Sequence, residues 1–417
     1  MTFVYRENIE ALRPDLLEKY GPVFRRIAEG TVDRERNRIL PHEQIKWLKE
    51  AGFPAVRVPR EQGGDGGSIV DLAALLIALA EADPNIPQAL RGHVVFSEDR
   101  LFAEPSLDRD IWLKRFAEGE IAGNAWTEIG TVGLWQTATS VKKDGDTLRL
   151  DGRKFYTTGS IFADWIDVLA RREDGVDVVA LVRKDSDGVT VSDDWDGFGQ
   201  RTTGSGAAVF QSVVVEPQNV LLFDDRVPYQ HALYQLVLLA SLAGIGRAIV
   251  RDTAEQIRNR TRVYSTGSGP SDRQDPQIQQ VVGQLAGLAY ATEASTIRAA
   301  AAIQRVFDAK VAGPDAVKAA NDAAHVEVYS AQIIVTEFTQ RAGSLLFNAL
   351  SASAARETHA LDRHWRNART ISSHNPVINK ERIIGDWHIN GTAPPINWSI
   401  GVPVATPGTG ETAAAAE

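Results

Sequence analysis

The 417-residue chain contains no cysteine and a single methionine. Without cysteine, the protein forms neither disulfides nor thiolate metal sites, and it cannot use a cysteine nucleophile. It also lacks a basic excess, because 45 lysines and arginines stand against 54 aspartates and glutamates, for a net charge of −9. This balance argues against a nucleic-acid partner. We see no metal-binding cluster, expect no metal, and expect a cytoplasmic location, which the composition permits.

The sequence also lacks an apolar run long enough to cross a membrane. The best candidate, LYQLVLLASLAGIGRAIV, is interrupted by Gln235, two glycines and Arg247. This pattern predicts a buried helix and no membrane span. The opening MTFVYRENIEALRPDLLEKY is charged and amphipathic from its start, so it does not have the pattern of a cleavable signal.

Hydrophobic periodicity divides the chain into three parts and a tail. Residues 1–122 show helical spacing, with the glycine-rich loop EQGGDGG between helices. From 123 to 228 the period changes to two, with β-branched runs and turns such as KDGD, which predicts a small β-domain. Helical spacing returns over 229–395, and residues 396–417 form the tail. The third part contains four long helical segments, at about 229–264, 275–310, 315–352 and 360–373. A bundle of this kind commonly pairs with copies of itself.

This order of parts resembles the acyl-CoA dehydrogenase fold, of class α+β. Four stretches carry the resemblance, which runs from about residue 45 to 395: VPREQGGDGGS, GEIAGNAWTEIG, DGRKFYTTGSIFADW and GFGQRTTGSGAAVFQSVVVEPQNVL. The resemblance implies an N-terminal helical domain, a central small β-barrel or sheet domain and a C-terminal four-helix bundle. It also implies a homotetramer, two dimers joined through the bundle.

The stretch WRNARTISSHNP, residues 365–376, indicates a branch of that family. Dehydrogenases of this fold carry a Tyr-Glu-Gly-Thr segment whose glutamate removes a proton from the thioester substrate. Here Asn375 fills that position, after His374, and an asparagine side chain is no base at neutral pH. With GDWHING near the end, the stretch resembles the flavin-dependent monooxygenases of this fold, above all dibenzothiophene monooxygenase and sulfur-acquisition oxidoreductases.

The resemblance implies a chemistry and a set of site residues. Reduced flavin and O2 would form a C4a-hydroperoxyflavin in a dry cavity and oxygenate a small organosulfur, aromatic or amine substrate. Thr158 would hold flavin N5 through its hydroxyl, and His93 and His374 would hydrogen-bond the peroxy group and could lend it a proton. The implied catalytic residues are His93, Thr158, His374 and Asn375. The implied cofactor-binding residues are Asn124, Trp126, Thr127, Tyr156, Thr158, Trp195, Arg366 and Arg369.

Each of these residues also has a structural interpretation. His93 lies in an apolar neighbourhood and could be a core histidine bonded to a carbonyl. Thr158 could be an ordinary strand hydroxyl, and His374 a turn residue. The two tryptophans could be core packing. Arg366 and Arg369 could form interhelical ion pairs instead of binding phosphate.

The sequence favours FMN over FAD. Where the dehydrogenases have a glycine loop, LSASAARETHALDRHW contains no glycine, which removes the close backbone approach that a pyrophosphate requires. No dinucleotide fingerprint follows a strand, so a separate flavin reductase would supply reduced FMN by diffusion, as in a two-component system. The alternatives are an acyl-CoA dehydrogenase that uses another carboxylate, such as Glu357, a nitroalkane or amine flavin oxidase, and a scaffold without flavin.

Overall fold

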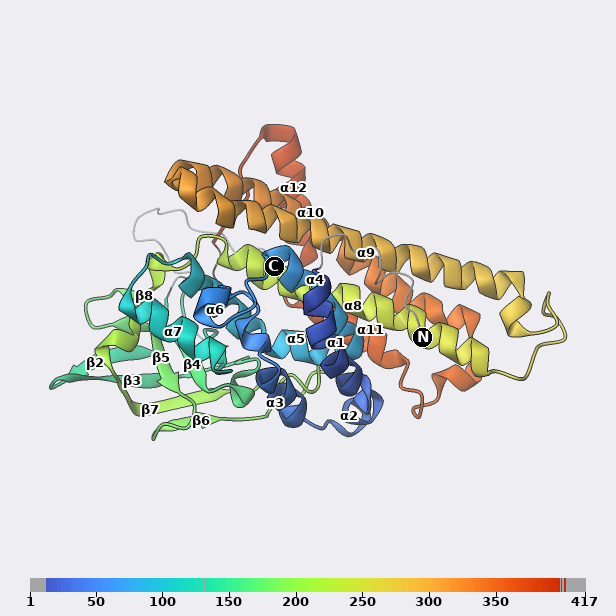
Figure 1. Ribbon diagram of the computed structural model, residues 1–417, viewed down its shortest axis with the longest axis horizontal. Helices are drawn as coiled ribbons and strands as arrows, with labels where there is room; N and C mark the ends of the chain where they lie inside the picture. The colour runs from blue at the N-terminus through green and yellow to red at the C-terminus, as the bar shows by residue number, and fades with distance from the viewer. Residues whose placement is uncertain (1–12, 131, 135, 398, 400, 403–417) are drawn as a thin grey trace, which may run out of the picture.

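The computed structural model describes residues 13–130, 132–134, 136–397, 399 and 401–402. An N-terminal helical region, a β-domain and a bundle of long helices follow one another along the chain and pack side by side (Figure 1). This order confirms the predicted α+β class. Most of the predicted tail lies outside the described residues.

The N-terminal region surrounds one nearly apolar helix, α4. Its start is fixed by a capping box, in which the Ser68 hydroxyl accepts the Asp71 N–H at 3.0 Å and the Asp71 carboxylate accepts the Ser68 N–H at 2.8 Å. Almost all of α4 is buried, because other helices cover it on every side. The helices of this region are α1 (Pro14–Ala28), α2 (Thr31–Asn37), α3 (His42–Glu50), α4 (Ile69–Ala82), α5 (Asn85–Ala89), α6 (Arg91–Phe102) and α7 (Leu107–Ala117), with 3-10 turns η1 (Phe53–Ala55) and η2 (Arg60–Gln62).

The β-domain is an eight-stranded sheet with its own apolar core. The strands are β1 (Ala122–Ala125), β2 (Ser140–Asp144), β3 (Thr147–Lys154), β4 (Trp165–Arg172), β5 (Asp177–Arg183), β6 (Val189–Val191), β7 (Ala208–Val215) and β8 (Val220–Leu222). Seven run in the order β6-β7-β3-β2-β4-β5-β8, and β1 pairs with β4. β1 and β2 share one edge of β4, both in parallel, and the other ladders are antiparallel. The sheet therefore brings the chain that follows β1 next to the chain that follows β3, where Thr127 bridges Phe155.

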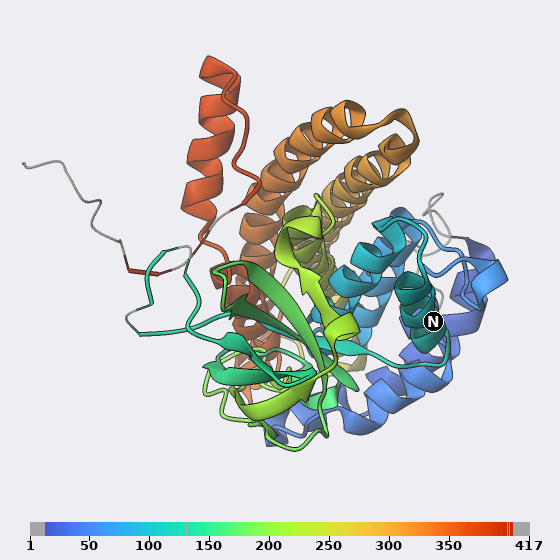
Figure 2. The ribbon, with the colours of Figure 1, turned by 90° about the vertical axis from the view of Figure 1, so that its left-hand side faces the viewer.

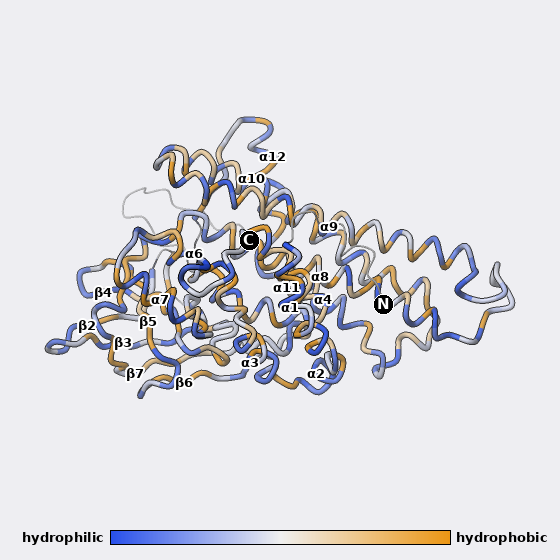
Figure 3. The backbone as a smooth tube through the Cα atoms, viewed as in Figure 1, coloured by the Kyte–Doolittle hydropathy of each residue, from blue (hydrophilic) through white to orange (hydrophobic). Residues whose placement is uncertain are grey.

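Long helices form the third part. They are α8 (Gln230–Asn259), α9 (Pro276–Asp308), α10 (Pro314–Leu345) and α11 (Asp362–Ser373), connected through 3-10 turns. Apolar and polar residues alternate along them, as expected of helices with one buried face (Figure 3). α8 is long and apolar enough to cross a membrane by composition, but 89% of its most apolar window is buried inside the protein. It is the predicted core helix.

A further helix, α12 (Val377–Asn390), was not predicted. It projects beyond the rest of the bundle (Figure 2) and packs on α10, where the Lys380 ammonium lies 3.8 Å from the ring centroid of Tyr329; among its residues only Lys380 and Ile383 are buried. Ile378 and Ile389 are 69% and 81% exposed. Ile383 joins the main apolar core and Ile384 packs against it, whereas Ile378 and Ile389 face away from this core, so α12 has no continuous apolar face. This division obscured the helical pattern.

Candidate active site

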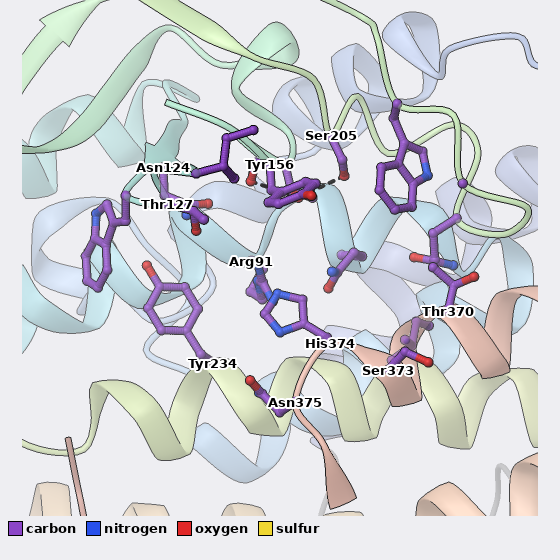
Figure 4. Close-up of a pocket in the computed structure, with 18 of the residues that line it drawn as sticks. Arg91, Asn124, Thr127, Tyr156, Ser205, Tyr234, Thr370, Ser373, His374 and Asn375 are labelled. Carbon is purple, nitrogen blue, oxygen red and sulfur yellow. Dashed lines mark hydrogen bonds between the residues drawn. The ribbon is translucent and has the colours of Figure 1, made fainter. Parts of the chain in front are cut away.

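A cavity of about 650 Å³ lies where the three parts meet. Its walls come from the start of α6, the chain after β1 and β3, the loop before β7, the start of α8 and the end of α11 (Figure 4). The lining combines aromatic rings with a few polar groups and has the size typical of ligand pockets, ~300–1,000 Å³. Of the predicted residues, it brings together Asn124, Trp126, Thr127, Tyr156, Thr158, Trp195, His374 and Asn375.

The FYTTGS stretch turns sharply so that Thr158 faces the cavity. Tyr156 has a left-handed φ of 55°, and Gly159 has a φ of 80° with its α-carbon so close to α5 that a Cβ would lie 1.8 Å from the Ala89 carbonyl oxygen. Only glycine fits there. The turn leaves the Thr158 hydroxyl 2.8 Å from the Ser205 hydroxyl, which is a second short polar group on the same wall.

His374 ends α11 and meets a cation. Its Nε2 lies 2.7 Å from Nη1 of Arg91, at the start of α6. A guanidinium only donates, so Nε2 accepts and the imidazole carries its proton on Nδ1. Burial and the neighbouring Arg91 lower the pKa of His374 to about 3. At neutral pH His374 is therefore an uncharged ring, and its Nδ1–H is the group that could lend a proton.

Asn375 is held between two helices of the bundle. Its side-chain Nδ2 donates to Oε1 of Gln235 on α8 at 2.9 Å, and its backbone carbonyl oxygen accepts from the side-chain amide of Gln332 on α10 at 3.1 Å. These bonds fix the end of α11 and with it the position of His374. They also place an amide in the cavity wall, where a catalytic base would need a carboxylate.

Among the described residues that line the cavity, Glu128 is the one carboxylate, and it is fully engaged. It lies 2.7 Å from Nζ of Lys154 and accepts bonds from Thr137, Ala138 and Thr139. Burial opposes its ionisation, but the Ala138 N–H and the Lys154 ammonium outweigh burial and lower its pKa to about 2. Such a carboxylate is a poor base. Glu357, the alternative base considered from sequence, is exposed and does not line the cavity.

Aromatic side chains and unsatisfied polar atoms on the walls fit a flavin. Tyr156 meets Trp195 edge to face at 6.2 Å, and Trp126 is fixed by a 2.7 Å bond from its indole N–H to Asp167. Buried polar atoms without a partner include Oδ1 of Asn124 and both amide atoms of Gln200. Buried polar groups are normally hydrogen-bonded, so orphans that line a cavity indicate a polar ligand. The flat ring system of FMN offers both aromatic surface and hydrogen-bonding edges.

Three predicted site residues lie outside the cavity. His93 donates from Nε2 to the Pro54 carbonyl at 2.9 Å and accepts the Ala122 N–H at Nδ1 at 3.4 Å, and it packs edge-on against Phe116. Burial lowers its pKa to about 4. Both ring nitrogens are thus used inside the core, which contradicts the predicted catalytic role and fits the core-histidine interpretation.

Arg366 and Arg369 connect elements and do not line the cavity. Arg366 donates to Glu35 on α2 and to Asp362 one turn earlier, at 2.9 and 2.8 Å. Arg369 donates to Gln340 on α10 at 3.0 Å. Their predicted role as phosphate ligands is not supported, because these partners lie outside the cavity and engage both guanidinium groups.

Sequence reasoning missed Arg91, Ser205 and Tyr234, which all line the cavity. Arg91 stands two residues before His93, and residues two apart on a helix point about 200° away from one another. The stretch ALRGHVVF therefore contained the signal, but we chose the residue on the wrong face of α6. A close approach of Gly92 to Asn124, where a Cβ would lie 2.9 Å from two of its atoms, seats the start of α6 on β1.

Comparisons with known proteins give consistent matches. The acyl-CoA dehydrogenase N-terminal, middle and C-terminal domains match residues 23–120, 124–213 and 236–378. A probable FMNH2-dependent monooxygenase, SfnC of Pseudomonas putida, is 27% identical over 379 residues, 88% of this chain and 93% of that protein. Dibenzothiophene monooxygenase of Rhodococcus qingshengii is 24% identical over 380 residues, 87% of this chain and 90% of that protein. The crystal structure of TdsC from Paenibacillus sp. A11-2 with FMN and indole is similar with a TM-score of 0.83, at 26% identity over 91% of this chain and 98% of that one.

Proposed function

The chain belongs to the acyl-CoA dehydrogenase family, in its branch of flavin-dependent monooxygenases, and we propose that it uses reduced FMN and O2 to oxygenate a small organosulfur compound in this cavity. One observation carries the proposal: the end of α11 presents His374 and Asn375, where proton abstraction would need a free carboxylate. The cavity therefore suits oxygen transfer better than dehydrogenation.

When bound, reduced FMN supplies two electrons and the means to activate O2. The residues that would hold it are Asn124, Trp126, Thr127, Tyr156, Thr158 and Trp195, and we add Ser205, whose hydroxyl lies on the same wall as that of Thr158. The paired hydroxyls of Thr158 and Ser205 give one wall a donor and an acceptor that can exchange roles. We propose that Thr158 bonds the N5 edge of the ring. Ser205 is already anchored by Thr203 at 2.6 Å, so it holds the Thr158 hydroxyl in place.

His374 acts as a neutral group in this site. With Nε2 occupied by Arg91, its Nδ1–H is the part that can donate to a reacting oxygen. The positive charge beside it comes from Arg91, whose pKa burial lowers to about 10, so it stays cationic at neutral pH. We propose that this pair stabilises negative charge that develops on oxygen. Trp126 and Tyr234, which meet edge to face at 5.5 Å, help to exclude water from the same side.

We also propose how the chain receives reduced FMN and how it assembles. A separate reductase delivers reduced FMN by diffusion in the cytoplasm, and the chain assembles as a homotetramer through its bundle. The exposed isoleucines of α12 support assembly, because a monomer would leave them in water. Light scattering at micromolar concentration should give the mass of four chains, and the mass of one chain would contradict this part.

Reconstitution tests the function directly. The protein, FMN, a flavin reductase and NADH are incubated under ¹⁸O2 with organosulfur compounds, and products are analysed by mass spectrometry. We expect one ¹⁸O atom per turnover in the product. In a parallel anaerobic assay, acyl-CoA thioesters should reduce no dye. Dye reduction by acyl-CoA together with no ¹⁸O incorporation would refute the monooxygenase proposal in favour of a dehydrogenase.

A further inference from the structure

Arg91 is a buried cation without a carboxylate partner among the described residues. It is 5% exposed, and its contacts are His374 at 2.7 Å and the ring of Tyr234, whose centroid lies 5.4 Å from the guanidinium carbon. Its Nε has no hydrogen-bond partner. Every other buried arginine that the structure describes pairs with a carboxylate: Arg34 with Asp83, Arg57 with Glu98, Arg100 with Asp99, Arg226 with Asp167, Arg247 with Glu293 and Arg363 with Asp252. Arg91 also differs from them in that it lines the cavity.

The cavity wall supplies no negative charge to balance Arg91. Glu128, the one carboxylate among the described lining residues, is bound to Lys154. His374 and His231 are uncharged at neutral pH, because burial lowers the pKa of His374 to about 3 and that of His231 to about 4. Burying an unpaired charge is costly, so such groups are normally paired or reserved for a ligand. The cavity therefore has an excess of one positive charge, which a ligand with a single negative charge would balance.

Arg91 lies beside the wall on which we place the flavin ring. The next residue, Gly92, packs so closely on Asn124 that a Cβ would lie 2.9 Å from the backbone nitrogen and from Oδ1 of Asn124. Gln88, three residues before Arg91, also lines the cavity, and its Oε1 and Oδ1 of Asn124 are buried without partners. Arg91 is thus close both to Asn124 and to His374 (Figure 4). A ring bound on this wall would feel the charge of Arg91, because attraction between charges is strong where water is excluded.

We infer that Arg91 makes the cavity selective for reduced FMN over oxidised FMN, by balancing the negative charge of the reduced ring. The inference rests on the proposed function, in which FMN is the cofactor. The oxidised ring is neutral. Two electrons and one proton convert it into the anion FMNH⁻, which carries the single negative charge that the cavity lacks. A cation beside the ring is one of the means by which a protein tunes a flavin.

The FMN phosphate is a less suitable partner for Arg91 than the reduced ring. A phosphate monoester carries a charge of about −1.5 to −2 at pH 7, so one buried guanidinium would leave part of this charge unbalanced. The phosphate is also separated from the ring by the ribityl chain. Because Arg91 lies beside Asn124, in a cavity whose aromatic walls suit the ring, the ring is the closer group.

Selective binding and the reduction potential of bound FMN are linked. If the protein binds reduced FMN more tightly than oxidised FMN, bound FMN is easier to reduce by the same factor. A charge-assisted interaction contributes more than a neutral one, so we expect reduced FMN to bind roughly tenfold to a hundredfold more tightly. A tenfold change corresponds to ~30 mV for a two-electron couple, so the potential of bound FMN should lie ~30–60 mV above that of free FMN.

Anaerobic binding and potentiometry test the inference without turnover. Oxidised and reduced FMN are titrated into the full-length protein and into Arg91→Gln and Arg91→Lys variants, and the potential of bound FMN is measured against redox dyes. Arg91→Gln should bind oxidised FMN about as well as the parent, which also shows that the variant is folded, but it should lose the preference for reduced FMN and the shift in potential. Arg91→Lys keeps the charge and should retain part of both.

Riboflavin and pH provide the controls. Riboflavin has the same ring without the phosphate, so it should show the same preference in the parent and the same loss in Arg91→Gln. At acidic pH, where reduced FMN is neutral, the parent should lose its preference. This second control needs no variant, so it decides the matter even if Arg91→Gln does not fold.

Any of four results would overturn the inference. The parent could bind both forms of FMN equally, its preference could persist at acidic pH, or the preference could survive in Arg91→Gln. The fourth result is an equal weakening of both forms of FMN in Arg91→Gln with riboflavin binding unchanged, which would assign Arg91 to the phosphate.

Failure of this inference can be separated from failure of the proposed function. A preference for reduced FMN that depends on Arg91, in a protein that incorporates no ¹⁸O into any compound, supports the inference and refutes the monooxygenase proposal. Incorporation of ¹⁸O by a protein whose affinity for the two forms of FMN does not depend on Arg91 does the reverse.

Discussion

The hydroxyl of Thr158 offers the sharpest test of where flavin binds. Thr158→Val keeps the shape of the side chain but removes its bond to Ser205 at 2.8 Å and its longer contact with the Tyr156 carbonyl at 3.4 Å. Ser205 retains Thr203 at 2.6 Å, so no buried hydroxyl is left without a partner. The free energy of unfolding should therefore fall by less than about 1.5 kcal/mol.

Flavin binding should change much more than stability. If Thr158 bonds the flavin ring, the valine variant leaves a buried polar atom of the ligand unsatisfied, at a cost of ~1–3 kcal/mol, or roughly tenfold to a hundredfold in Kd. Quenching of tryptophan fluorescence by FMN reports this Kd, since Trp126 and Trp195 line the cavity. Hydrogen peroxide released per NADH should rise in step, because the reacting oxygen would be held less well.

Thr158→Ser is the matched control, because it keeps the hydroxyl and removes only a methyl group. It should bind FMN within a few-fold of the parent and release little extra peroxide. A valine variant with the parental Kd and peroxide yield would show that Thr158 is only a wall residue, and the flavin position proposed above would be wrong.

Three further predictions concern pH, backbone and assembly. The pKa of His374 is lowered to about 3 and that of His364 to about 4, below the ordinary 6.5, so unfolding takes up protons and stability falls as pH drops below 6.5. His374→Gln should make the free energy of unfolding less dependent on pH between 6.5 and 5, and an unchanged dependence would contradict the lowered pKa. Gly159→Ala should lower the free energy of unfolding by more than about 2 kcal/mol in thermal or urea unfolding, because its Cβ would clash with Ala89. Gly145→Ala, also at positive φ but with open space around it, should lower it by only about 1 kcal/mol. Equal costs would refute the packing argument. Ile378→Asp with Ile389→Asp should leave the fold of one chain intact but dissociate the proposed tetramer in light scattering, whereas an undisturbed assembly would exclude α12 from the interface.

The sequence predicted the fold because long periodic segments carry strong signals. The helices α8 to α11 and the strands of the β-domain follow from spacing alone, and the monooxygenase resemblance drawn from WRNARTISSHNP is confirmed by the relatives. Helix α12 escaped because only Ile383 and Ile384 among its isoleucines pack on the core of this chain, while Ile378 and Ile389 are exposed. The spacing of apolar residues on a helix does not identify its buried face when that face would pack on another molecule.

The site was only partly predictable, for a different physical reason. Residues in local turns, such as Thr158 and the His374–Asn375 pair, were found because the turn and the side chain lie in one motif. Arg91 and Ser205 enter the cavity from elements far apart in sequence, and only packing brings them to His374 and Thr158. His93 was chosen for its residue type, but it lies on the face of α6 that points away from the cavity. The packing of α6 on β1 decides which face lines the cavity, and the sequence does not show this packing.

The connection between α11 and α12 has a thermodynamic consequence. His374 and Asn375 lie in the cavity wall, and Pro376 leads directly into the projecting α12. If neighbouring chains hold α12, the free energy of assembly and the free energy of ligand binding share one structural element. Linkage is reciprocal, so a ligand that fixes His374 strengthens assembly by the same factor by which assembly strengthens its binding. The apparent affinity for FMN or substrate should then fall when the protein is diluted, because dilution dissociates the assembly.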